Sequence, residues 1–318
     1  MYSGPVWPAV HFLKRNIHVP PANLPANNIL SLTAEKVGGT NRHKLFILSS
    51  RQVCRRGFMV LSFGGQNNTA VGFRFGSKGT HSSRTMMLAE LASVMYAVPP
   101  NGSRKEYVSA VIDANCLRKP TISTRRLSLQ RLSELYALDP EIPIFRILRL
   151  LWDADRVSRP QLAILAALAR DPLLMATAQA IVPLAEGLEM PRKSMTEGLR
   201  EKVGDRLSDA TLDKVIRNTA SSWSQSGHLS GRTFKIRRKI QPTPRAVAFA
   251  LYLGVGSGFH GEELLASGWI KTLDCSPSQA LNLAVEAKRL GLLDLRVAGD
   301  VFDLSLNRLD PRSVGSTR

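Results

Sequence analysis

The sequence is poor in several residue types, and each shortage argues against a class of protein. Its three cysteines, Cys54, Cys116 and Cys275, are scattered and odd in number, so neither a disulfide framework nor a zinc site is expected. No apolar run approaches the ~20 residues of a membrane-spanning helix. Aromatic residues make up only 6% of the chain, which disfavours the aromatic-bearing sheet of many RNA-binding domains.

Acidic residues are also scarce. The chain of 318 residues has 25 Asp and Glu against 43 Lys and Arg, which gives a formal net charge of +18. An excess of this size favours a polyanionic partner: DNA, RNA or an anionic membrane surface. The N-terminus does not show the ordered charged and apolar regions of a signal peptide. Because the sequence shows no signal peptide, no membrane-spanning run and no disulfide framework, we expect a cytoplasmic protein that does not act at a membrane.

Hydrophobic residues make up 44% of the chain, enough for a core and for two modest domains. Residues 1–80 differ from the rest, because they are rich in Pro, Asn, Gly and Ser, and Glu35 is the only acidic residue before Glu90. The stretch GFRFGSKGTHSS near their end is typical of a linker. The sequence predicts a basic, poorly ordered N-terminal extension over residues 1–80, with folding from about Ser82.

Residues 81–190 predict an N-terminal helical domain. Helical patterns cover 83–98, 104–115 and 124–136, with Ser103 and Ser123 as the expected caps of the second and third. A helix, a short turn and a capped helix form a helix-turn-helix pattern. Its outward candidates for DNA contact are Arg125, Arg126 and Gln130, and the alternative is plain packing within a helical bundle.

Residues 207–240 organise the rest of the chain. Ser208 is the expected N-cap of a helix from Asp209, and Gly227 stands where a helix C-terminal glycine would stand. A spacing of 3.6 residues places six side chains on the core face: Leu212, Val215, Ile216, Thr219, Ala220 and Trp223. No acidic residue lies between Gly227 and Gln241, so the segment after the helix predicts a basic wing.

Lys, Arg, Asn, Ser and Gln on an outer helix face supply phosphate contacts and base-edge donors and acceptors. The alternative is a solvated helix face beside a basic hairpin. The DNA-binding candidates of the helix are Lys214, Arg217, Asn218, Ser221 and Gln225. Those of the wing are Arg232, Lys235, Arg237, Arg238 and Lys239.

Residues 191–310 together predict a C-terminal winged-helix region, followed by a tail at 311–318. Its second winged-helix pattern begins with Ser276 as a cap and Pro277 in the first turn, and Gly291 ends the helix. A hairpin with a turn at 298–300 follows. Because this second wing is nearly neutral, we expect it to pack or dimerise rather than to bind DNA.

The sequence shows no arrangement of residues for catalysis. Asp153 and Asp155 lie two residues apart and diverge on a helix, and His260, Glu262 and Glu263 do not have a metal-ligand spacing. Cys116 and Cys275 have no neighbouring His. We expect a protein that is not an enzyme and needs no cofactor or metal.

Four stretches together resemble the BrxA-like family of BREX phage-defence loci. They are SRTMMLAEL, DANCLRKPTISTRRLSLQRLSELYALDP, LSDATLDKVIRNTASSWSQSGHLSG and AKRLGLLDLRVAGDVFDLSL, within residues 82–306. The resemblance implies a mostly helical, non-enzymatic DNA-binding component with helix-turn-helix-like parts. It also implies partners of three kinds: a methyltransferase, an ATPase and a phosphatase-like protein. The long N-terminal extension and the longer middle region depart from the family's pattern.

Residues and resemblance together predict a mainly α-helical protein that binds double-stranded DNA in antiviral defence. Two alternatives stay open. One is an assembly subunit of the same defence complex that binds proteins without reading DNA, and the other is an RNA-binding protein.

Overall fold

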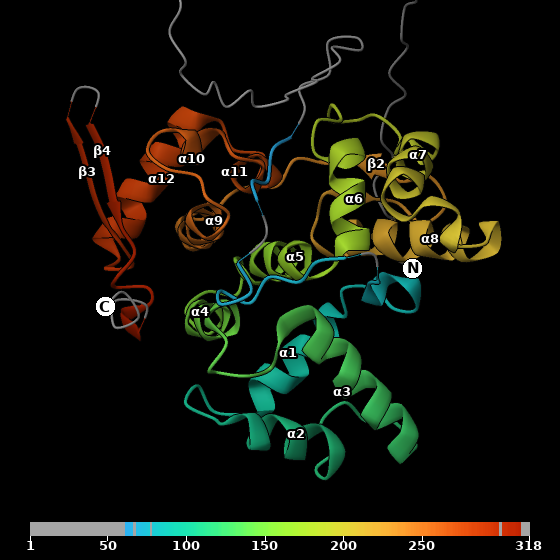
Figure 1. The fold of residues 1–318 in the computed structure, drawn as a ribbon. Coiled ribbons are helices and arrows are strands. Elements are labelled where there is room, and N and C mark those ends of the chain that lie inside the picture. The colour runs from blue at the N-terminus through green and yellow to red at the C-terminus, as the bar shows by residue number, and fades with distance from the viewer. Residues whose placement is uncertain (1–60, 66–67, 77, 299–300, 313–318) are drawn as a thin grey trace, which may run out of the picture. The chain divides into compact units, whose positions relative to one another are not determined.

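Helices make up most of the described chain, which comprises residues 61–65, 68–76, 78–298 and 301–312 of the computed structural model (Figure 1). The expected mainly α-helical fold is therefore confirmed. In chain order, the elements of the first half are the 3₁₀ turn η1 (Thr80–Ser82), α1 (Leu88–Ala97), α2 (Arg104–Ile112), α3 (Ile122–Tyr136), α4 (Pro143–Trp152), α5 (Arg159–Arg170) and α6 (Pro172–Ile181). Those of the second half are α7 (Arg192–Val203), the 3₁₀ turn η2 (Gly204–Arg206), α8 (Asp209–Gln225), β1 (Leu229–Ser230), β2 (Ile236–Arg237), α9 (Pro244–Gly256), α10 (Glu263–Ala266), α11 (Gly268–Thr272), α12 (Pro277–Arg289), β3 (Asp294–Ala298) and β4 (Val301–Ser305).

Helix α5 lies at the centre of these elements. Every residue from Gln161 to Arg170 is buried, and the helix packs against α3, α4, α6, α8 and α9. A helix that is apolar all round must be covered on all sides. Three groups of elements provide this cover, and Figure 1 shows them around α5: α1–α4, α6–β2 and α9–β4.

The first group begins with α1, whose inward side chains Leu91, Val94 and Met95 are buried as the periodicity predicts. Ser103 caps α2 as predicted, in a reciprocal pair with Glu106. Helix α3 begins earlier than predicted. Thr121 is its N-cap in place of Ser123, and its hydroxyl accepts a hydrogen bond from the Thr124 N–H.

The second group has the order helix, extended segment, two helices and hairpin. Strands β1 and β2 are antiparallel, with Leu229 opposite Arg237. The extended segment 187–190 pairs with the other edge of β2: the Met190 N–H donates to the Lys235 carbonyl at 2.7 Å, and the Arg237 N–H donates to the Leu188 carbonyl at 2.8 Å. Strand β2 therefore lies between β1 and the segment that precedes α7.

The third group has a similar order, with α9, the short helices α10 and α11, then α12 and the β3–β4 hairpin. Helix α12 packs on α9 and α10, and β3 follows along α12. Ser276 caps α12 by accepting from the Gln279 N–H, and Gly291 has a positive φ of 73° just after the helix, as the sequence predicts. In the hairpin Arg296 lies opposite Asp303, and these two opposite charges are consistent with the nearly neutral charge of the hairpin.

The structure corrects the prediction of a poorly ordered extension up to residue 80. Leu61, Phe63 and Phe73 are buried in the main core, where the ring of Phe63 meets that of Trp269 edge-on at 5.1 Å. The backbone also joins the fold, since the Ile144 N–H donates to the Val71 carbonyl at 3.0 Å. The described residues between 61 and 80 are thus part of the folded unit, because these three apolar side chains fill gaps between helices. The remainder of the predicted extension, residues 1–60, lies outside the described residues.

The predicted boundary near residue 190 does not separate two cores. One hydrophobic cluster contains side chains from Leu61 to Leu309, on both sides of that boundary. The smaller second cluster, which includes Leu173, Leu199 and Val215, joins α6, α7 and α8 across that boundary. The apolar helix α5 makes this possible, because it is covered by elements from both predicted domains.

In the described part of the chain, no single helix has the length and apolar composition to cross a membrane. The consecutive helices α5 and α6 have that length and composition only when they are taken together, and the chain bends by 118° between them.

Candidate nucleic-acid interface

Helix α8 carries the first set of predicted contact residues, and its core face is confirmed. Ser208 caps it by accepting from the Thr211 N–H, and the six predicted core side chains are all buried. Trp223 anchors the helix to α6, because its indole N–H donates to the Thr177 hydroxyl at 2.8 Å. This packing fixes which part of α8 faces outward.

The outward strip of α8 is narrower than predicted. Lys214 and Arg217 are exposed, and Ser221 is half-buried on the same side. Lys214 makes no hydrogen bond or ion pair with the described residues, whereas Arg217 lies 3.6 Å from Asp213 one turn earlier. Since both partners of that pair are exposed, it contributes at most about 1 kcal/mol and leaves the guanidinium free to bind another group.

The prediction that Asn218 and Gln225 face outward is wrong. The Asn218 side-chain amide donates to the His81 carbonyl at 2.8 Å, and the Gln225 side-chain carbonyl accepts from the Leu88 N–H at 3.1 Å. Both side chains satisfy the backbone of the segment that runs from η1 into α1. They are therefore held in the fold and do not belong to a contact surface.

Arg237 on the predicted wing is also not a contact residue. Its side chain is 1% exposed and forms a two-point ion pair with Asp274, which is 6% exposed. Its Nε also donates to the Ile181 carbonyl at 3.0 Å, at the end of α6. A guanidinium with this many internal acceptors is a structural anchor that ties the hairpin to α6 and to the chain after α11.

The other basic side chains of the hairpin do lie at the surface. Arg232, Arg238 and Lys239 are exposed, and Lys235 is half-buried. Arg238 donates from Nε to the Ser230 hydroxyl at 3.1 Å, which holds its stem along the hairpin. Phe234 is 66% exposed at the tip. The hairpin therefore presents basic side chains at the surface directly after α8 in the chain.

The predicted contact residues of α3 separate into two kinds. Arg125 is used inside the fold, where its Nη1 donates to the Ile112 carbonyl at 2.9 Å and so closes the α2–α3 turn. Arg126 is exposed and has no hydrogen bond or ion pair with the described residues. Gln130 is exposed and donates to Glu134 at 3.1 Å. Only Arg126 and Gln130 are placed where a partner can reach them.

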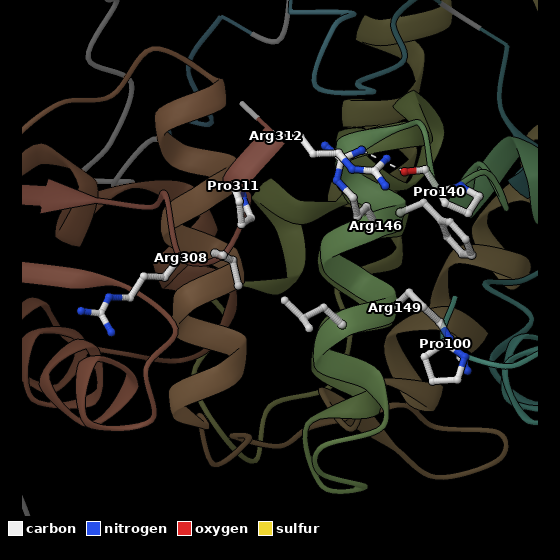
Figure 2. Close-up of a pocket in the computed structure, with 10 residues that line it drawn as sticks. Pro100, Pro140, Arg146, Arg149, Arg308, Pro311 and Arg312 are labelled. Carbon is white, nitrogen blue, oxygen red and sulfur yellow. Dashed lines mark hydrogen bonds between the residues drawn. The ribbon is translucent and has the colours of Figure 1, made fainter. Parts of the chain in front are cut away.

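A pocket of about 440 Å³ lies between α4 and the segment 308–312, and Figure 2 shows its lining. Each of its four arginines has a partner within the fold. Arg146 pairs with buried Asp310 at 2.8 Å, and Arg149 donates to the Met95 carbonyl at 2.7 Å. Arg308 and Arg312 pair with Asp294 and Glu141 at 2.7 and 3.0 Å. Part of the predicted tail, Pro311 and Arg312, therefore borders this pocket, while residues 313–318 lie outside the described residues.

The structure contains a Ser–His–Asp chain that the sequence did not reveal. His81 Nδ1 lies 2.8 Å from Asp171 Oδ2, and His81 Nε2 lies 2.7 Å from the Ser222 hydroxyl. The spacing resembles that of a hydrolase triad, but His81, Asp171 and Ser222 are all fully or almost fully buried. The three residues come from η1, the N-cap of α6 and α8, so the chain joins three elements.

Further contacts of this set are structural. The Ser222 hydroxyl also accepts from the Met86 N–H at 2.8 Å, and Asp171 caps α6 by accepting from the Leu173 and Leu174 N–H groups. Burial alone would raise the pKa of the Asp171 carboxyl, but the charge and hydrogen bonds of His81 outweigh it and hold that pKa below its ordinary value. The buried Ser222 hydroxyl is thus fully engaged, since it also donates to the Asn218 carbonyl at 3.0 Å.

No group of three or more His, Cys, Asp and Glu side chains in the described residues is arranged to hold a metal ion. Burial raises the pKa of both described thiols, Cys116 and Cys275, which disfavours their reactive thiolate forms. What the arrangement offers is two exposed basic segments that follow one another in the chain: the outward strip of α8 and the β1–β2 hairpin. No family model matches the chain, and no curated protein matches it.

Proposed function

We propose that the protein binds double-stranded DNA through a winged helix-turn-helix formed by α6 to β2. Helix α8 is its recognition helix and the β1–β2 hairpin its wing. The single observation that carries the proposal is that α8, on which Lys214 and Arg217 are exposed, is followed directly in the chain by a hairpin that has no acidic residue between Gly227 and Gln241.

The order of the elements supports this assignment. A winged helix-turn-helix places its second helix of the turn in the major groove and lets the following hairpin reach the backbone or the minor groove. Here α7 and α8 are joined by the turn η2, and β2 pairs both with β1 and with the segment before α7. Lys214 and Arg217 would then face base edges or phosphates, and Arg232, Arg238 and Lys239 would contact the backbone.

The group α9 to β4 repeats the order of helices and hairpin, and we propose it as a second winged-helix module with a different role. Its hairpin is nearly neutral, and Val297 and Val301 are exposed on it. This composition suits contact with protein better than contact with phosphate.

The resemblance to BrxA-like proteins supports the assignment of this DNA binding to phage defence. We propose that the chain is a non-enzymatic, cytoplasmic component of a BREX-type phage-defence system. A basic protein with little sequence selectivity would hold DNA beside a methyltransferase and an ATPase, which supply the chemistry. Loss of protection against phage in a strain that carries only a DNA-binding-deficient variant would support this role, and full protection would contradict it.

The DNA-binding proposal is tested by two double charge reversals of equal net charge. Lys214→Glu with Arg238→Glu changes the proposed interface, and Arg156→Glu with Arg296→Glu changes two exposed cations elsewhere. Anisotropy of a labelled duplex is measured over a series of salt concentrations. We expect the interface pair to lower affinity strongly and to flatten the log K against log salt slope by roughly two contacts of about 0.9 each, while the control pair leaves both nearly unchanged. Equal losses of DNA affinity in both double variants would mean that binding depends on overall charge, and the assignment of α8 and its wing as the interface would be wrong.

A further inference from the structure

A furrow runs along α3 and is separate from the outward strip of α8. It consists of two adjoining clefts of about 570 and 680 Å³, which share Arg74, Gln130 and Glu134. Helix α2 borders the larger cleft opposite α3. Lys78, Gly79 and the turn before α8 border the smaller one.

The rims of the furrow are strongly basic. Its lining includes a single acidic side chain, Glu134, and seven basic ones: Arg74, Lys78, Arg104, Arg126, Arg131, Arg170 and Arg206. Arg126 and Lys78 are exposed and make no hydrogen bond or ion pair with the described residues, and Arg104 is 73% exposed with only a 3.4 Å contact to Asp139. Burial, together with the charge of Arg74, lowers the pKa of Arg170 to about 10. The furrow therefore favours a negatively charged occupant.

The floor of the furrow is aliphatic. Val108 and Ile112 from α2 line the larger cleft with Leu129 and Leu138, and Leu173 and Leu207 line the smaller one. Val108 is 39% exposed, and Ile112, Leu129 and Leu207 are half-buried, whereas Leu138 and Leu173 are already buried within the fold. Such a floor is stabilised by covering it with other apolar side chains, at about 25 cal/mol per Å² of surface removed from water.

We infer that the α3 furrow is a docking site for an acidic amphipathic helix of a partner protein. A helix can direct aliphatic side chains at positions i, i+4 and i+7 onto the floor while carboxylates on its flanks reach the two basic rims. An extended strand cannot do both, because its side chains alternate between the floor and the solvent.

The same observations disfavour nucleic acid in the furrow. Single-stranded nucleic acid is held mainly by stacking on exposed aromatic rings, and the single aromatic residue in the lining, Tyr107, is buried. A duplex offers charged phosphates and few apolar groups for an aliphatic floor. The inference does not rest on the DNA-binding proposal, because Lys214, Arg217 and the hairpin do not line the furrow.

The test uses the full chain and a fluorescent synthetic peptide of about 16 residues, with Leu at helical positions i, i+4 and i+7 and Glu at the flanking positions. The control peptide has the same composition in scrambled order, which removes the apolar stripe and keeps the charge. We expect the striped peptide to bind at least about tenfold more tightly than the scrambled one, because only the striped peptide covers the floor. Equal binding of both peptides would reduce the furrow to a patch of positive charge and would overturn the proposal.

Two variants locate the binding, each with its thermal transition checked. Arg126→Glu removes a rim cation that has no hydrogen bond or ion pair with the described residues, and Val108→Asp places a carboxylate in the floor at an exposed position. Both should weaken the striped peptide about tenfold or more, while Arg296→Glu, a reversal on the distant β3, should change it less than about twofold. Retained affinity in both furrow variants would overturn the proposal. Displacement of the peptide by duplex DNA, with loss of DNA affinity in Arg126→Glu, would assign the furrow to DNA and would overturn it equally.

Discussion

Arg237 and Asp274 form a buried two-point ion pair across 37 residues of sequence. Arg237 comes from β2, and Asp274, with a positive φ of 56°, lies two residues after the end of α11. The second carboxylate oxygen also accepts from the Ile240 N–H at 2.9 Å. The pair therefore fastens the β1–β2 hairpin and the chain that follows it to the third group of helices.

Removal of one partner of this pair should destabilise the fold. Arg237→Ala leaves the Asp274 carboxylate buried without its guanidinium, and we expect a loss of about 3–5 kcal/mol in the free energy of unfolding, measured with urea. Arg238→Ala, its exposed neighbour, should change stability by less than about 0.5 kcal/mol. If the two variants unfold at the same urea concentration, the pair does not stabilise the hairpin.

The segment that precedes η1 should contribute to stability. Phe63→Ala removes a buried ring from its edge-on contact with Trp269, and we expect a cost of about 3–5 kcal/mol. Phe75→Ala is the matched control, because this phenylalanine is 38% exposed, and its cost should be much smaller. Thermal unfolding of the two variants compares them directly, and similar melting temperatures would remove residues 61–76 from the core.

Stability should fall with acid in a window set by His228. This residue is fully buried, its Nε2 donates to the Thr272 carbonyl at 2.7 Å, and burial lowers its pKa from the ordinary 6.5 to about 4. The unfolded chain takes up a proton below pH 6.5 and the folded chain only below about pH 4. The contribution of the neutral ring is therefore complete above pH 6.5 and is lost as the pH falls towards 4, by up to about 3 kcal/mol.

Urea unfolding at several pH values measures this dependence. His228→Gln keeps hydrogen-bonding groups but does not titrate, so its stability should be flatter between pH 6.5 and 4. The contribution of Asp171 to stability can be distinguished in the same series. Because the pKa of its carboxyl is lowered, this stabilising contribution is lost only at pH values below the ordinary carboxyl pKa of 3.8. An unchanged slope in His228→Gln would show that another group titrates in this window.

Single substitutions should distinguish a base contact from a phosphate contact in the proposed interface. Arg217→Ala should weaken the binding of preferred DNA sequences by about 1–3 kcal/mol if the guanidinium reaches a base edge. Arg238→Ala should weaken binding to all sequences and reduce the salt slope by about one contact. Anisotropy with several duplexes measures both effects, and a uniform loss with a flatter slope in Arg217→Ala would make that residue a phosphate contact as well.

Several local features were predictable from the sequence alone. The limits of α8, its Ser208 cap and its six buried core side chains followed from the 3.6-residue spacing, because the helical period and the capping hydrogen bond are local properties. The caps of α2 and α12 and the hairpin after α12 followed for the same reason. Lys214 and Arg217 were correctly placed outward, since they lie directly opposite the core face.

Only the tertiary structure decided which polar side chains of the predicted interface are available. Asn218 is held by His81 across 137 residues, and Arg237 by Asp274 across 37, and neither distance leaves a periodic signal in the sequence. The same holds for Phe63 and Phe73, whose segment is too rich in glycine and serine to show a pattern and is ordered by the helices that it fills. Spacing along the chain determines which face of a helix is apolar, whereas the partner that meets a charged or polar side chain depends on how distant segments pack.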